Sequence, residues 1–156
     1  MWPVWPLSGG DPRRTRRGAF REKPLQLARQ HHLLVPLLLS FFNYGVTLTS
    51  KGDYDEALTT FEEGLILAEK VSNEIWHHRI LNSFGWLYSE CGNLGRALDF
   101  NRRGAEGARK RGDPETIANA ELNLANIFLA QGDFTLAQEF LDGVYPWRMI
   151  RRLANG

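Results

Sequence analysis

The sequence is poor in cysteine and almost free of net charge. Of its 156 residues only Cys91 is a cysteine, and 19 lysines and arginines nearly balance 18 aspartates and glutamates. A single cysteine excludes an internal disulfide and favours a reducing compartment, so we expect a cytoplasmic location. A formal net charge of +1 lacks the basic excess typical of nucleic-acid-binding proteins. We therefore expect no nucleic-acid partner.

The chain also lacks a long hydrophobic run. The longest, LLVPLLLSFF at 33–42, is about half the length needed to span a bilayer. Four arginines within 13–17 precede it, as in a secretion signal, but charged residues and two histidines separate the two parts. We expect neither a secretion signal nor a membrane partner.

Motifs for catalysis and metal binding are missing as well. The chain has no G-x-x-x-x-G-K loop, no G-x-S-x-G and no H-E-x-x-H. Its histidines form two adjacent pairs, His31–His32 and His77–His78, and adjacent helical residues point about 100° apart, which suits no shared metal ion. No histidine lies at a spacing from Cys91 that would suggest activation of its thiol, so we expect an inert cysteine. The sequence predicts no enzyme, no catalytic residue, no metal and no cofactor.

What the chain does contain is a forty-residue repeat. Each unit has two stretches with apolar residues at three- and four-residue spacing, which predicts two amphipathic helices. The residues that coincide after shifts of forty include three glycines (Gly52, Gly92, Gly132), the residues after them (Asp53, Asn93, Asp133), three alanines (Ala57, Ala97, Ala137) and three small upstream residues (Gly45, Gly85, Ala125).

The turn residues predict how the helices begin and end. The repeated glycine ends the first helix because it adopts the left-handed conformation without strain. The Asp or Asn after it is expected to cap the second helix by accepting a backbone N–H bond, and Glu56 follows Asp53 as in a capping box. Asn73 and Asp113 are expected to cap the next first helices, with Pro114 at a first helical position. Short turns make the two helices antiparallel neighbours, and small residues such as Gly45 let them approach closely.

This pattern resembles the tetratricopeptide repeat family over about 25–145. The likeness rests on Phe41, Tyr44, Gly45, Leu48, Gly52, Tyr54, Ala57 and Phe61 in the first unit, on Leu81, Phe84, Gly85, Tyr88, Gly92, Ala97 and Gly104 in the second, and on Leu124, Ala125, Phe128, Gly132, Phe134, Ala137 and Leu141 in the third. It implies an all-α fold, a right-handed superhelical solenoid of about three antiparallel helix hairpins with a leading helix. The period of forty implies longer helices, as in similar segments of bacterial signalling regulators and kinesin light chains.

Two positions depart from the family pattern. Glu121 stands where a bulky apolar residue is usual, and Asn101 stands where an aromatic residue is usual, with Phe100 one step away. We expect the packing to be looser or slightly rotated at both places.

The ends of the chain leave the repeat. We predict a disordered basic arm at 1–23, a repeat domain at 24–145 that starts with half a unit near 24–32, and a tail at 146–156. Gly143 and Pro146 break the pattern, so the last second helix should be short, near 133–143. Phe140 and Leu141 on that helix need cover. The tail, a second copy or the rest of a longer protein could supply it, and the half unit favours the last.

The resemblance implies that first helices line the concave side of the solenoid. Asparagine is a poor helix former, yet it recurs on this side, where its amide can both donate to and accept from a peptide backbone. A tryptophan would add an apolar platform and an arginine could meet a carboxylate. The candidate peptide-binding residues are Asn43, Arg79, Asn82, Trp86, Asn119, Asn123 and Asn126. The alternative is that these asparagines only solubilise the helix face or bond to the next helix.

We therefore predict a protein–protein interaction scaffold that binds a peptide or protein segment in its concave groove. The alternative is a structural, self-associating regulatory segment of a larger bacterial signalling protein, which would form homo-oligomers through its open repeat ends.

Overall fold

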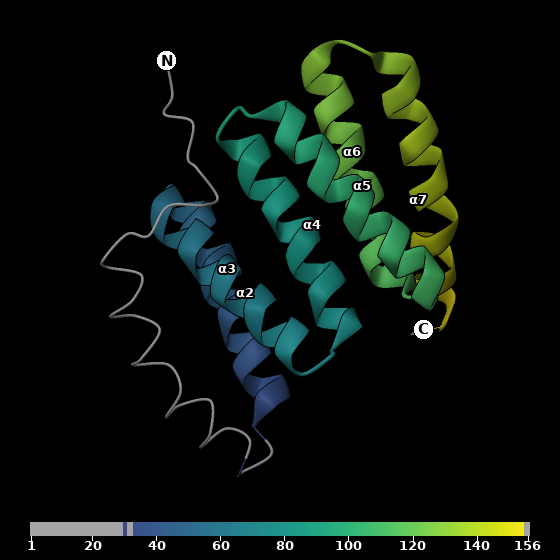
Figure 1. Cartoon of the computed structure of the whole chain (residues 1–156). Helices are drawn as coiled ribbons and strands as arrows, with labels where there is room; N and C mark the ends of the chain where they lie inside the picture. The colour runs from purple at the N-terminus through teal and green to yellow at the C-terminus, as the bar shows by residue number, and fades with distance from the viewer. Residues whose placement is uncertain (1–29, 31–32, 155–156) are drawn as a thin grey trace. The chain divides into compact units, whose positions relative to one another are not determined.

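The computed structural model describes residue 30 and residues 33–154, with side chains only as far as residue 144. The described residues form helices and no strands, which confirms the all-α class (Figure 1). The helices are α2 (Leu34–Lys51), α3 (Tyr54–Lys70), α4 (Glu74–Glu90), α5 (Leu94–Arg111), α6 (Pro114–Gln131) and α7 (Phe134–Ala154). The predicted arm and nearly all of the predicted half unit lie outside the described residues.

The helices repeat with the predicted period. First helices begin at 34, 74 and 114, and second helices begin at 54, 94 and 134. From Leu38 onward the chain is one compact unit, in which each helix from α3 to α6 packs on the next helix along the chain. The first helices α4 and α6 also contact each other directly. Packing between units as well as within them confirms the predicted stack of hairpins (Figure 1).

One turn geometry connects all of these helices. The residue with positive φ lies at Gly52, Ser72, Gly92, Gly112 and Gly132, that is, every twenty residues. At the first turn the Gly52 N–H donates to the Thr49 carbonyl at 3.1 Å and the Asp53 N–H donates to the Leu48 carbonyl at 3.0 Å. The other four turns repeat both bonds, a Schellman-type ending that satisfies the last carbonyls of each helix. The predicted role of the glycines is confirmed, and the turns between units share it.

Ser72 is the non-glycine exception among these turns, at φ 51°. A side chain in the left-handed region costs about 1–2 kcal/mol, and the equivalent turn one unit later uses Gly112. We expect Ser72→Gly to raise the free energy of unfolding by about 0.5–1 kcal/mol in urea denaturation, part of the relief being offset by the flexibility of glycine when unfolded. Ser72→Ala keeps the strain and should give no gain. A loss of stability in Ser72→Gly would contradict this account of the turn.

The predicted caps form at four of five helix starts. The side chains of Asn73, Asn93, Asp113 and Asp133 each accept the backbone N–H three residues ahead, at 3.1–3.4 Å. The prediction is wrong for Asp53, whose side chain makes no cap bond. Asp53 is exposed, so water can satisfy the first N–H groups of α3. The capping box is absent too, because Glu56 instead accepts the Tyr44 hydroxyl at 2.9 Å.

Small residues allow close contact inside the hairpins, as predicted. A Cβ added at Gly45 would lie closer than 3.0 Å to three ring atoms of Phe61, and one added at Gly85 would clash with the Asn101 amide. Phe61 and Asn101 are fully buried. Aromatic and aliphatic side chains such as Phe84 and Leu124 complete the core between the helices.

The loosening expected at Asn101 is not found. Its side chain is fully buried and its Nδ2 donates to the Ala97 carbonyl at 2.9 Å. Phe100 replaces the missing aromatic contact, because its ring stacks on Phe84 at 5.1 Å and on Tyr88 at 5.4 Å. Satisfied hydrogen bonds make the buried amide compatible with tight packing.

Two neighbouring residues, Arg109 and Gly143, accommodate the Glu121 side chain. Its Oε1 accepts the Arg109 guanidinium at 2.8 Å. Gly143 lies against it on α7, where an added Cβ would be 3.0 Å from Glu121 Oε2. A half-buried carboxylate is tolerated here because it has a charged partner and room.

The prediction of a short last helix is wrong. Helix α7 continues to Ala154, through Gly143 and Pro146. A proline removes one backbone hydrogen bond and can kink a helix, but the residues on either side can stay helical. Phe140, which we expected to need cover, stacks on Phe128 of the same hairpin at 5.5 Å.

Candidate protein-binding surfaces

The first candidate surface is the first-helix face, the side of α2, α4 and α6 that was predicted to bind peptide. Asn43, Asn119 and Asn126 are exposed on it, Arg79, Trp86 and Asn123 are half-buried, and Asn82 is buried. Equivalent positions forty residues apart place these residues on matching sides of equivalent helices. Among the described residues, no partner is recorded for the side chains of Asn43, Asn119 and Asn126, so their amides remain available.

Asn82 and Asn123 hold helices together. The Asn123 Nδ2 of α6 donates to Asn82 Oδ1 of α4 and to Asn101 Oδ1 of α5, both at 3.1 Å. One amide thus links three helices of two neighbouring hairpins. For these two residues the geometry agrees with the alternative to peptide binding, in which an asparagine bonds to the next helix.

Arg79 is occupied by neighbouring carboxylates. Its Nη2 lies 3.1 Å from Glu115 Oε2 and its Nε lies 3.5 Å from Asp113 Oδ2. The guanidinium also lies over the Trp76 ring, 5.4 Å from its centroid. Burial would raise the pKa of Asp113, but its bonds to Thr116 and the charge of Arg79 outweigh burial and lower that pKa. Arg79 therefore joins α4 to the start of α6.

Trp86 keeps the position expected of an apolar platform. Its side chain is half-buried, and its Nε1 donates to Glu90 Oε1 at 3.0 Å. This bond fixes the indole along α4 and leaves part of the ring exposed. Leu129 of α6 adds apolar surface on the same side, with 43% of its surface exposed.

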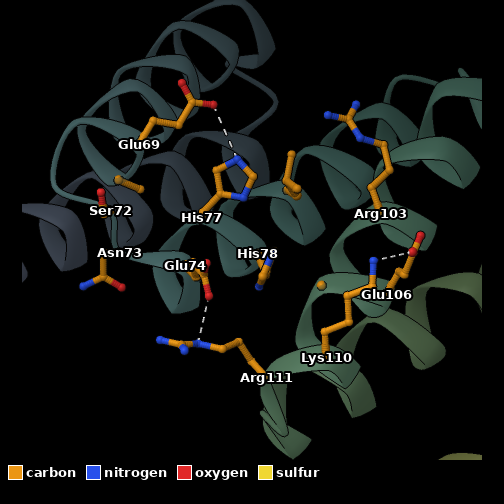
Figure 2. A pocket seen from close by; sticks show the side chains of 13 residues that line it. Glu69, Ser72, Asn73, Glu74, His77, His78, Arg103, Glu106, Lys110 and Arg111 are labelled. Atoms are coloured by element: carbon orange, nitrogen blue, oxygen red, sulfur yellow. Dashed lines mark ion pairs between the residues drawn. The ribbon is translucent and has the colours of Figure 1, made fainter.

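A second surface, which the sequence did not suggest, is a cleft between the end of α3, the start of α4 and the end of α5 (Figure 2). We call it the α3–α5 cleft. Its volume is about 820 Å³. Its lining residues are Ala68, Glu69, Ser72, Asn73, Glu74, His77, His78, Leu81, Arg103, Glu106, Gly107, Lys110 and Arg111.

Ion pairs cross and line this cleft. His77 Nε2 of α4 lies 3.4 Å from Glu69 Oε1 of α3, and Arg111 Nε of α5 lies 3.0 Å from Glu74 Oε2 of α4. Lys110 Nζ pairs with Glu106 at 2.8 Å within α5. Figure 2 shows Glu69 and His77 on one side, with Arg103, Glu106 and Lys110 on the other.

His78 lies between the two walls of the cleft. A Cβ added at Gly107 would overlap its imidazole, so the glycine makes room for the ring. Burial, followed by the nearby His77, lowers the pKa of His78. Its Nδ1 is buried, and no described residue pairs with it. Burial therefore favours the neutral ring, and one polar atom has no partner among the described residues.

Within residues 33–144, no three His, Cys, Asp or Glu side chains gather as metal ligands would. Cys91 is exposed at the end of α4, and partial burial of its thiol, followed by the charges of Asp55 and Glu90, raises its pKa. In the part of the chain that the structure describes, no helix has the length and apolar character needed to cross a membrane.

The family model of the tetratricopeptide repeat matches residues 36–110. The repeat units within 36–110 thus match the tetratricopeptide repeat, and α6 and α7 continue the same forty-residue period. The TPR domain of Arabidopsis FLU has a TM-score of 0.63 to this chain at 20% identity, over 79% of this chain and 99% of that one. BtubC (BKLC) from P. vanneervenii has a TM-score of 0.63 at 21% identity, over 93% of this chain and 59% of that one. At such identities these two structures support the fold alone.

One curated relative is similar to this chain. The outer dynein arm-docking complex subunit 4 of Mus musculus is 25% identical over 115 residues, which are 74% of this chain and 18% of that protein. The chain thus spans less than a fifth of that relative's length. The comparisons do not confirm the likeness to bacterial signalling regulators.

Tetratricopeptide repeats generally serve as scaffolds for protein–protein interaction and are typically not enzymes. The family's general role agrees with a chain whose described surfaces offer amides, aromatic rings and ion pairs. It does not indicate which of the two surfaces receives a partner.

Proposed function

We propose that the chain holds an extended segment of a partner protein on its first-helix face. The observation that carries this proposal is the set of three exposed asparagines, Asn43, Asn119 and Asn126, for which no partner is recorded among the described residues. A primary amide can donate to a peptide carbonyl and accept from a peptide N–H, so it binds backbone irrespective of sequence. Trp86 and Leu129 add apolar contact nearby.

The structure changes which residues should test this idea. Asn82 and Asn123 bond helices to each other, so their removal would weaken the fold and obscure any effect on binding. Asn119 and Asn126 lie on the same helix, are exposed, and support no other helix. Their loss leaves the core unchanged.

The test is selection of binding peptides from a displayed library, followed by affinity measurements on the selected peptides. Asn119→Ala combined with Asn126→Ala should weaken binding by about fivefold or more, because two amide contacts contribute about 0.5–1.5 kcal/mol each. The control is Gln138→Ala, which removes a similar amide from an exposed position on α7. Unchanged affinity in the Asn119/Asn126 variant would overturn the assignment of this face.

Self-association is the second candidate. Phe134, at the start of α7, has 72% of its surface exposed, and such an apolar side chain on a terminal hairpin could contact a second copy. Light scattering over a range of concentrations separates the candidates, because a mass that stays monomeric excludes self-association. The predicted cytoplasmic location and the predicted bacterial signalling role remain predictions.

A further inference from the structure

Charged residues are distributed unevenly between the two kinds of helix. The lysine, arginine, aspartate and glutamate residues of the first helices α2, α4 and α6 are Lys51, Glu74, Arg79, Glu90, Glu115 and Glu121. Helix α3 alone carries as many, and α5 carries more. Burial does not explain the difference in α2, where half of the residues are exposed and Lys51 alone is charged. The first helices are therefore depleted in charge on exposed positions as well.

The carboxylates of the first helices have partners within the chain. Glu74 and Glu121 each pair with an arginine of α5, at 3.0 and 2.8 Å. Glu115 accepts the Arg79 guanidinium at 3.1 Å, and Glu90 accepts an indole N–H of its own helix at 3.0 Å. A cationic segment would have to compete with these contacts.

Cations are scarce on the same helices. Arg79 lies 3.1 Å from Glu115 and 3.5 Å from Asp113, so two carboxylates already neutralise it. Lys51 lies in the last turn of α2, next to the Gly52 turn. Acidic side chains or a free chain end are bound through unoccupied cations. In the described part of α2, α4 and α6, the cation away from a helix end is occupied.

The first-helix face exposes amide and apolar surface instead. Asn43, Asn119 and Asn126 are exposed, and Leu39 and Leu129 have 44% and 43% of their surfaces exposed. An amide bonds well to a peptide group, but an ion that loses its water without meeting an opposite charge is strongly disfavoured. Such a surface accepts neutral side chains and disfavours charges of either sign.

We propose that the first-helix face binds an uncharged, internal segment of its partner protein, with neutral polar and apolar side chains. The inference rests on the proposed function and names the class of segment that this face selects. The complementarity is between a surface whose charges are already paired and a segment that carries none. The segment is internal because a free chain end would bring a charge with it.

A randomised peptide library, displayed with both ends joined to a carrier protein, tests the proposal with the full chain. The selected segments should be depleted in lysine, arginine, aspartate and glutamate relative to the unselected library. Replacing a central residue of a selected peptide by lysine, or by glutamate, should weaken binding about fivefold or more in each case. Affinity for the selected peptide should change less than about twofold between about 50 and 500 mM sodium chloride, because no ion pair forms on binding.

A change of charge on the face should change what it selects. Asn126→Asp adds a carboxylate of the same shape at an exposed position of α6. Selection with this variant should enrich lysine and arginine, and the affinity of those peptides should fall about tenfold or more over the same range of salt. Thr135→Asp adds the same charge at an exposed position of α7 and should go on selecting neutral segments.

Failure of this inference differs from failure of the proposed function. Unchanged binding of the selected peptides by the Asn119/Asn126 alanine variant would mean that the face is not the site, and both would fall. If that variant loses binding but the selected segments are rich in one sign of charge, the face is the site and the inference is wrong. A steep salt dependence with the unchanged protein, or neutral segments selected equally by Asn126→Asp, would also overturn it.

Discussion

Replacing Gly45 with alanine is expected to lower the free energy of unfolding by about 1–3 kcal/mol, the usual cost of overpacking a core. The added Cβ would lie closer than 3.0 Å to three ring atoms of Phe61. Phe61 of α3 is fully buried, so its ring has little space into which to move. Urea denaturation monitored by helical circular dichroism measures the loss.

Gly95→Ala is the matched control for this prediction. Gly95 lies in the first turn of α5 and is exposed, and an added Cβ would meet only the Asn93 side chain, at 3.9 Å. Alanine is a better helix former than glycine by about 1 kcal/mol, so this change should leave stability unchanged or raise it. A Gly45 variant as stable as the Gly95 variant would show that α2 and α3 do not approach as closely as the structure has them.

The second large effect is expected from Asn123→Ala. Its amide supplies hydrogen bonds to Asn82 and Asn101, both of which are buried. Removing a donor from a buried acceptor costs about 1–3 kcal/mol, and two acceptors lose it here. We expect a loss toward the upper end of that range, seen as a lower urea midpoint with the same slope.

Asn119→Ala, one turn earlier on α6, is the control for Asn123→Ala. It removes the same group from an exposed position, and surface changes of this kind usually alter stability by less than about 0.5 kcal/mol. Equal effects of the two substitutions would mean that the three asparagines are not connected in solution. The pair also separates structural asparagines from those proposed to bind a partner.

The forty-residue step was predictable because glycines recur at this interval. Gly52, Gly92 and Gly132 each meet a backbone requirement that other residues meet poorly, so they recur visibly. The same turn at Ser72 was missed, since a serine carries no such signal. Its traces in the sequence were the expected cap Asn73 and Gly112, forty residues later.

Two of the wrong predictions share a cause, because each considered one helix alone. The rule that Gly143 and Pro146 end a helix is local, and α7 continues past both residues. The expected loosening at Asn101 ignored hydrogen bonds from another helix, which no single-helix pattern contains. The cap at Asp53 had the right residue type but did not form.

The candidate sites were harder to predict than the fold. Helical periodicity placed Asn43, Asn82 and Asn123 on one face, yet it could not distinguish an exposed amide from one bonded to a neighbouring helix. The α3–α5 cleft depends on which side chains meet across three helices.

Backbone amide exchange measured by NMR tests the repeated hairpins most directly. The first N–H groups of a helix have no carbonyl partner within it, and the caps bond only the third of them. Amides near 54–56, 74–75, 94–95, 115 and 134–135 should therefore exchange faster than mid-helix amides such as those of Phe61, Phe84 and Asn101. Fast exchange should thus recur every twenty residues. Uninterrupted protection through any of these five starts would contradict the account.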